Sequence, residues 1–114
     1  MDLIKDIVAH LTEELGGVRV ATERPANSPK QLVTVVRTGG GGSEFAQTAQ
    51  VVIATWGESD KDAYNLGRRV ADAMFGLPGY SDNVVEVTQN SFYKDTYTDG
   101  TRRWSSAYNI YHNR

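Results

Sequence analysis

The sequence predicts an α+β fold, with two helices packed on one mostly antiparallel sheet and the element order α-β-β-β-α-β-β. Two observations lead to this prediction: hydrophobic residues recur at helical spacing in two segments, and short β-branched runs bounded by turn-forming residues lie between and after them. The 114 residues are near the usual size of one domain, and 39% of them are hydrophobic, which is enough for one packed core. We therefore expect a single domain over residues 1–114.

The first helix is expected over residues 3–15. Its hydrophobic positions follow a three- and four-residue spacing that places them on one face: Leu3, Ile4, Ile7, Val8, Leu11 and Leu15. The pair Gly16-Gly17 ends this helix, and a short strand is expected over residues 18–21. Two prolines within residues 23–29 then favour an exposed loop over a paired strand.

Two strands rich in β-branched residues are expected next, over residues 32–38 and 47–56. Hydrophobic residues occupy both alternating sets of positions, so we expect both faces to be covered, one by a helix and the other by something else, such as a neighbouring subunit. Between the strands, residues 39–43 comprise four glycines and one serine. Ordering such a run costs much backbone entropy, so we expect a mobile loop here.

The second helix should begin after Ser59, because Ser59 and Asp62 have the spacing of a capping box. It should end near Gly76, before Pro78. One face of this helix carries the residues Ala63, Leu66, Gly67, Val70, Ala71, Met74 and Phe75.

A long hairpin is expected to close the chain. Its first strand starts in the valine-rich segment 84–87, and its second strand is the segment 104–110, in which hydrophobic and polar residues alternate. An Asp-Gly pair at residues 99–100 is a strong turn signal between the two strands. We expect this hairpin to protrude.

Aromatic residues gather around the polar tip of this hairpin. A lone subunit would have little core there to receive Phe92, Tyr93 and Tyr97, so we interpret them as a contact surface. The strongest local positive charge comes from the arginine pairs at residues 68–69 and 102–103. Because the chain is acidic overall, these arginines suit salt bridges between subunits better than nucleic-acid binding.

Composition argues against several classes of function. A net charge of -2 and a pI near 5.6 make nucleic acid a poor default partner, and the absence of cysteine excludes disulfides and thiolate metal sites. The two histidines, His10 and His112, have no acidic cluster at metal-ligand spacing around them. The glycine run lacks the lysine and hydroxyl of a phosphate-binding loop, and no serine has the context of a catalytic nucleophile. We therefore expect no enzyme activity, metal or cofactor. The opening residues show neither a signal peptide nor a membrane span, so we also expect no membrane partner.

Several short motifs, taken in order, resemble the tail-terminator (tail-completion) family of long-tailed bacteriophages across nearly the whole chain. The motifs are Arg24-Pro25 before a valine-rich strand, Arg37-Thr38-Gly39-Gly40, a strand ending Ala54-Thr55-Trp56-Gly57, a helix from near Ala63, and a closing hairpin through Asp99-Gly100 to Arg102-Arg103-Trp104. Relatives often carry prolines before the last strand, where this chain has residues 93–97 without proline.

The resemblance implies a structural protein that assembles into a hexameric ring on the last ring of tail tube protein. Such a ring stops tube polymerisation, presents a surface to head-completion proteins, and lets DNA pass through its lumen without specific binding. It implies assembly in the host cytoplasm and a place at the head-proximal end of the virion tail. The candidate interface residues are Arg24, Arg37, Thr38, Gly39, Gly40, Phe92, Tyr93, Tyr97, Arg102, Arg103 and Trp104.

Three other functions remain open from the sequence. The first is another neck component, such as a head-tail adaptor, which shares the small size and lack of catalytic residues. The second is a small enzyme or ligand-binding α+β domain, which would need a pocket with convergent polar groups. The third is a binder of single-stranded nucleic acid that uses Tyr97, Arg102, Arg103 and Trp104.

Overall fold

The computed structural model describes residues 2–27, 29–43, 46–95 and 102–113, and it confirms the predicted α+β class and element order. One short helix, α3, was not predicted; it follows the second predicted helix and precedes the closing hairpin. The elements are α1 (Leu3–Leu15), β1 (Arg19–Ala21), β2 (Leu32–Gly42), β3 (Ala46–Gly57), α2 (Asp60–Phe75), α3 (Leu77–Tyr80), β4 (Val84–Lys94) and β5 (Arg102–Asn113).

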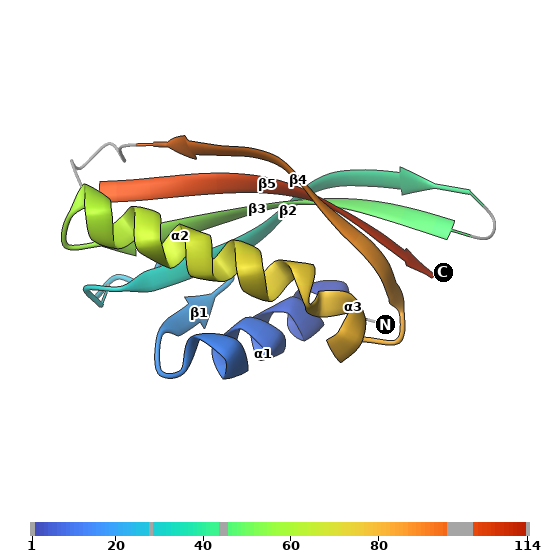
Figure 1. The fold of residues 1–114 in the computed structure, drawn as a ribbon, viewed down its shortest axis with the longest axis horizontal. Helices are drawn as coiled ribbons and strands as arrows, with labels where there is room; N and C mark the ends of the chain where they lie inside the picture. Colours follow the sequence, from blue (N-terminus) through green and yellow to red (C-terminus); the bar gives the residue numbers. More distant parts are fainter. Residues whose placement is uncertain (1, 28, 44–45, 96–101, 114) are drawn as a thin grey trace.

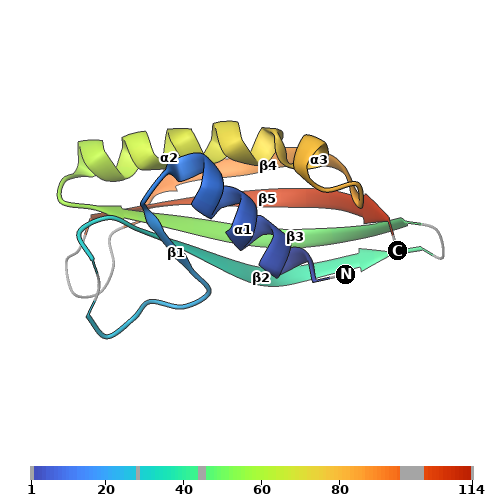
Figure 2. The same cartoon turned by 90° about the horizontal axis from the view of Figure 1, so that it is seen from below.

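The strands form one sheet in the order β1-β2-β3-β5-β4 (Figure 1). Every neighbouring pair is antiparallel except β1 and β2, which run parallel. The helices lie on one side of this sheet, with α2 over β3, β5 and β4, and α1 over β1 and β2 (Figure 2). Within the described ranges no helix covers the other face, which we call the helix-free face.

Local signals set the bounds of both long helices. Asp2 caps α1 by accepting a hydrogen bond from the Lys5 backbone N–H at 3.1 Å, and Gly16 ends the helix in a left-handed conformation with φ of 52°. Ser59 caps α2 in the predicted way, because its hydroxyl accepts from the Asp62 N–H at 3.1 Å. The predicted helix end near Gly76 is also confirmed.

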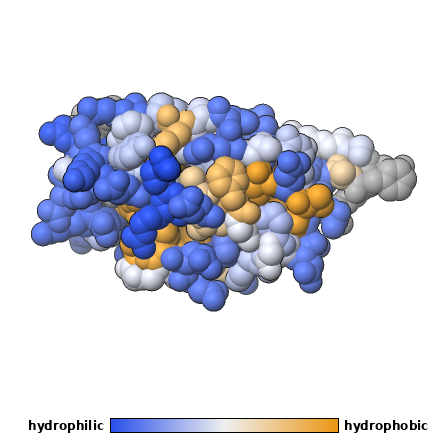
Figure 3. Space-filling view, in the orientation of Figure 1, coloured by the Kyte–Doolittle hydropathy of each residue, from blue (hydrophilic) through white to orange (hydrophobic). Residues whose placement is uncertain are grey.

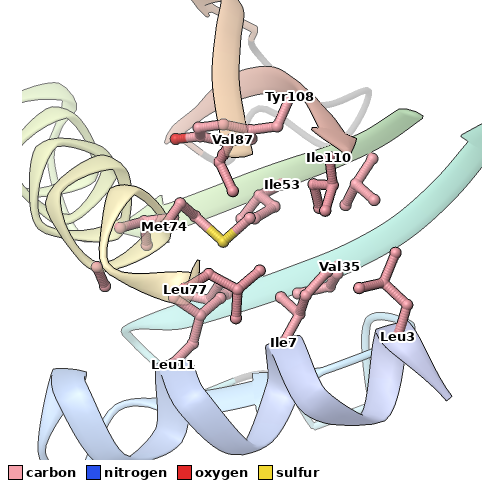
Figure 4. Packing of buried hydrophobic residues seen from close by; sticks show 14 of the residues in the cluster. Leu3, Ile7, Leu11, Val35, Ile53, Met74, Leu77, Val87, Tyr108 and Ile110 are labelled. Atoms are coloured by element: carbon pink, nitrogen blue, oxygen red, sulfur yellow. The ribbon is translucent and has the colours of Figure 1, made fainter. Parts of the chain in front are cut away.

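The main hydrophobic core lies between the helices and the sheet (Figure 4). Ile7 and Leu11 of α1 and Met74 of α2 are fully buried against Ile53 of β3, and α3 contributes the fully buried Leu77. The labelled residues in Figure 4 that close this core are Leu3, Val35, Val87, Tyr108 and Ile110. Burial of several such side chains, each contributing about 1.5–3 kcal/mol, holds the helix layer on the sheet.

Tyr108 is the largest fully buried side chain, and its hydroxyl is not isolated. The Gln89 side chain on β4 donates a hydrogen bond to this hydroxyl at 3.5 Å and another to Ser106 at 3.1 Å. Burial raises the pKa of Tyr108, so the phenol stays neutral across the physiological pH range. The polar pair of Gln89 and Tyr108 thus ties β4 to β5 inside the core.

The glycine run forms strand and not the predicted mobile loop. Gly39–Gly42 continue β2 and pair with residues 47–50 of β3, after a bulge between Arg37 and Gly39. A neighbouring strand supplies backbone hydrogen-bond partners for these glycines, which offsets their ordering entropy. Gly40 also has a φ of +155°, and a side chain there would collide with the carbonyl oxygen of Thr48. The glycines therefore permit close pairing of the two strands.

We call the paired residues 37–42 and 46–51 the arm. In Figures 1 and 2 the ends of β2 and β3 extend together beyond the helices, opposite the end of the sheet at which α2 begins. The turn at the tip includes Ser43, whose N–H donates to the carbonyl oxygen of Ala46 at 2.7 Å. The predicted loop over residues 23–29 is confirmed for the residues that the structure describes there.

Gly40→Ala tests whether the arm is ordered by its glycines. The added Cβ would meet backbone and would hold an unfavourable φ, so we expect this variant to lose about 1–3 kcal/mol of arm stability. Gly41→Ala is the matched control, because a Cβ at Gly41 has nothing within 4 Å. Amide hydrogen exchange across residues 39–42 and 47–50 measures the loss. Equal protection in the two variants would contradict the assigned role of Gly40.

Candidate assembly surfaces

The aromatic residues of the hairpin pack partly against the protein's own second helix. Phe92 of β4 stacks on Tyr64 of α2 with ring centroids 5.3 Å apart, and Trp104 of β5 lies 5.0 Å from each of them. Gly67, one turn beyond Tyr64, leaves room for this cluster because a Cβ there would lie 2.6 Å from the Phe92 ring. The expectation that a lone subunit could not receive the hairpin aromatics is therefore wrong for Phe92.

Tyr64 is a member of this aromatic cluster that the sequence did not predict. It lies one helical turn before Arg68 and three positions before Gly67, and an aromatic residue followed by glycine at that spacing can mark a helix that approaches a strand closely. Its own polar end is also engaged, because Arg68 donates to the Tyr64 hydroxyl at 3.2 Å.

An ion-pair cluster ties the hairpin to the start of α2. Lys94 Nζ lies 2.8 Å from an Asp60 carboxylate oxygen, and Arg102 Nε lies 3.9 Å from the other. The hydrogen bond from Lys94, together with the positive charges of Lys94 and Arg102, lowers the pKa of Asp60 below its ordinary value. Arg102, a candidate interface residue, is thus engaged within the subunit while staying half exposed.

A second polar cluster lies on the helix-free face. Arg103 Nη2 pairs with Asp95 Oδ2 at 2.6 Å, and the Ser105 hydroxyl donates to the same oxygen at 3.1 Å. The Arg103 guanidinium lies 5.4 Å from the centroid of the Trp56 ring, and that of Arg24 lies 5.7 Å from it. Both distances suit cation–π attraction. The fold thus brings the candidate residues Arg24 and Arg103 together on one tryptophan.

Trp56 anchors a small hydrophobic cluster on this face with Leu32 and Ala54. Beside it, a hollow extends along the sheet between Tyr93 and Val36. The predicted second cover for this face is therefore supplied in part by the loop that carries Arg24, while Tyr93 and Val36 stay 48% and 46% exposed.

The candidate residues of the Arg-Thr-Gly-Gly motif lie on the arm, and one of them, Thr38, also lines the hollow beside Tyr93. Arg37 Nε donates to the Gly39 carbonyl oxygen at 3.2 Å, and the Thr38 hydroxyl donates to the Gln50 carbonyl oxygen at 3.4 Å. These contacts hold the bulge between Arg37 and Gly39. The remaining candidate, Tyr97, and the turn signal at residues 99–100 lie outside the described residues.

Within the described ranges, β2 beyond the end of β1 has an edge without a strand partner, and so does β4. β1 pairs with β2 only at Leu32–Thr34, so residues 35–42 have no strand on their outer side within the described ranges. β4 is outermost along its whole length. The exposed valines Val36 and Val85 mark these two edges, and sequence reasoning missed both because β-branched residues were assigned to buried strands.

The histidines occupy structural positions. His10 is buried between α1 and α2, with Nε2 2.7 Å from the Ala73 carbonyl oxygen and its ring 4.7 Å from that of Tyr80. His112 lines a hollow with Asp2 and Arg37, between the start of α1 and the arm. Neither this hollow nor the one beside Tyr93 brings a serine next to a histidine. The described residues contain no group of three or more histidine, cysteine, aspartate or glutamate side chains that could hold a metal ion.

The helices give no sign of a membrane span. In the part of the chain that the structure describes, none is long and apolar enough to cross a bilayer.

No protein-family model matches the sequence, and no curated protein matches it. The fold does match a solved structure described as the virion of a native gene transfer agent (GTA) particle, with a TM-score of 0.70 and 13% sequence identity. The superposition covers 98% of this chain and 95% of that chain. At this identity the likeness establishes a shared fold: this α+β architecture also occurs in a chain of a gene transfer agent virion.

Asp60→Asn tests the ion-pair cluster through its pH dependence. Because the folded-state pKa of Asp60 is lowered, its stabilising effect is present above the ordinary value of 3.8 and is lost as the pH falls through the folded-state pKa. We expect the variant to unfold at lower urea concentration than the wild type at pH 7, and the difference to vanish near pH 2. Asp62→Asn is the control, because it also removes a negative charge from the first turn of α2 and therefore measures the effect of the helix dipole alone. An equal loss in both variants would exclude the contribution of Lys94 and Arg102.

Proposed function

We propose that this chain is a structural subunit of a phage-like particle, and specifically a tail terminator. In this role a ring of six copies caps the tail tube, stops its polymerisation and joins the tail to the head. The observation that carries the proposal is the shared fold with a chain of a gene transfer agent virion, because it extends over nearly the full length of both chains. The order of motifs along the sequence supports the finer assignment to a terminator.

The composition of the candidate surfaces supports a structural and not an enzymatic role. Two basic residues on these surfaces pair with acids of the same subunit, Arg103 with Asp95 and Lys94 with Asp60. Catalytic sites instead hold titratable groups in a pocket where they can act on a substrate. We therefore assign no cofactor and treat residues 1–114 as one domain built for assembly.

The same geometry argues against the nucleic-acid alternative. A stacking platform needs aromatic faces free to receive bases, but Trp104 packs against Tyr64 and Phe92. The positive charge of Arg103 is offset by Asp95. In a ring, a subunit with net charge -2 would also let DNA move through the lumen without tight binding.

The candidate interface residues divide into two roles in this proposal. Arg24, Arg102, Arg103 and Tyr93, with residues 37–40 of the arm, reach the surface and would contact neighbouring copies, the tube protein or the head-completion proteins. Phe92 and Trp104 would act indirectly, because their contacts with α2 hold the hairpin in position. In this proposal the particle assembles in the host cytoplasm. The subunit then lies at the head-proximal end of the tail.

A head-tail adaptor is the second candidate, because the shared fold with a chain of a gene transfer agent virion fits any structural position in such a particle. The two functions differ in the surface that the protein recognises. A terminator binds the growing end of a tail tube, whereas an adaptor binds the head side and leaves free tubes unchanged.

Adding the purified protein to polymerising tube protein from the same particle tests the proposal. We expect tubes to stop growing when the protein is present and to show an extra ring of density at one end by electron microscopy. Residues 37–40 are candidate contacts with neighbouring copies, so Arg37→Glu should weaken the ring and leave tubes uncapped, while Glu13→Lys, on the exposed side of α1, should cap them normally. Tubes that keep growing in the presence of folded wild-type protein would contradict the terminator function. Binding to head particles alone would identify an adaptor.

A further inference from the structure

The two unpaired edges occupy the same stretch of the sheet along the strand direction. We call residues that are aligned across the strands level with one another. Following the pairing across the sheet, Val36 is level with Val52, Ala107 and Ser91, and four residues later Gly40 is level with Val87. The open part of β2, residues 35–42, therefore lies level with residues 84–92 of β4. Below this level, β1 covers the β2 edge.

Neither edge is protected by lysine, by proline or by short length. Soluble proteins block exposed strands with lysine, proline or very short length. Residues 35–42 contain no lysine or proline, and residues 84–93 contain no lysine, arginine or proline. Both stretches are longer than a typical strand, and Val85 on the β4 edge is 63% exposed.

The charges beside the two edges are complementary. The β4 edge is flanked by two exposed acids, Asp82 and Glu86, and the chain has no basic residue between Gly76 and Tyr93. The β2 edge carries the exposed Arg37, and Lys5 of α1 lines a hollow with Asp2 and with Thr22, the residue that follows β1. The acidic β4 edge of one copy therefore attracts the basic β2 edge of another copy, whereas two like edges repel each other.

Hydrophobic side chains of the helix layer also lie beside each edge. Figure 3 shows hydrophobic side chains gathered where α2 ends and α3 and β4 follow, and the exposed residues there include Phe75 and Tyr80. On the β2 side, a hollow along α1 is lined by Ile4 and Val8. The β4 edge thus lies beside exposed aromatic side chains, and the β2 edge lies beside a hollow that is lined in part by hydrophobic residues.

We propose that β4 of one copy pairs with residues 35–42 of β2 in the next copy, so that the sheet continues from subunit to subunit. This inference rests on the proposed ring function and names the two surfaces that build the ring. Within one copy β4 runs antiparallel to β2, because three antiparallel pairings separate them. A copy rotated about an axis parallel to the strands keeps its strand directions, so the junction is antiparallel as well. The contact is heterologous, and it closes when the rotation completes a circle.

The bulges in both edges give this pairing selectivity. β4 has irregularities near Val85 and Asn90, and β2 has one near Thr38. Bulges increase local twist, so a flat foreign strand fits poorly while a copy of the same curved sheet fits well.

Engineered cysteines test this junction directly, because the chain has none of its own. Val36→Cys combined with Ser91→Cys places one thiol on each edge, both on the helix-free face. Within one subunit these positions are three strand spacings apart, about 14 Å, which exceeds the Cα separation of about 7 Å that a disulfide can span. Any cross-link therefore joins two copies. Companion variants pair Val36→Cys with Glu86→Cys or Thr88→Cys, because these also lie on that face and sample other registers.

Mild oxidation of the assembled double variants should give a ladder of covalent oligomers that ends at the ring size. A mixture of the two single variants should stop at covalent dimers, since each copy then has one reactive edge. Glu13→Cys with Lys61→Cys, on exposed helix positions, is the control and should give no ladder.

The outcomes separate this inference from the proposed function. If wild-type rings form by native mass spectrometry but none of the three double variants gives more ladder than the control, the junction lies elsewhere and the ring function stands. If Val36→Cys alone gives abundant dimers, the contact is two-fold and the head-to-tail pairing is wrong. If the wild type neither assembles nor caps tubes, the ring function fails and the junction fails with it.

Discussion

The structure depends on one geometric constraint: its helices cover a single face of a five-stranded sheet. α1 and α2 bury Ile7, Leu11 and Met74 against that face, and this core holds the helices on the sheet. The opposite face and both edges can be covered only by polar networks, short loops or other molecules. Every surface considered for assembly follows from this arrangement, because each is a part of the sheet that the helices do not reach.

Contacts within the subunit determine which parts of these surfaces are available to a partner. The cluster of Tyr64, Phe92 and Trp104 and the ion pairs at Asp60 hold the tip end of the hairpin against α2. On the helix-free face, Arg24 and Arg103 both lie over Trp56. The hairpin is therefore a supported part of the subunit, and the contacts open to a partner are the edges, the arm and exposed side chains such as Tyr93.

The sequence predicted the parts of the fold that local patterns determine. Helix spacing and the Ser59 cap located both long helices, and β-branched runs located the strands. The glycine run was misjudged because the order of residues 39–42 comes from pairing with β3, which no local pattern encodes. The four-residue helix α3 was missed because its Leu77 is buried by tertiary packing and has too few neighbours to form a periodic pattern.

The candidate site was predictable only in part for the same reason. Arginines and aromatics could be named from the sequence, but the strand order β3-β5-β4 decided that Phe92 and Trp104 face α2 while Arg103 and Tyr93 face away from it. Hydrogen exchange of the backbone amides, compared between dilute subunits and assembled rings, reports on both edges in one experiment. We expect residues 35–42 and 84–92 to gain protection together on assembly, while β3 and β5 stay unchanged. Rings in which both edges exchange as fast as in the free subunit would contradict this expectation.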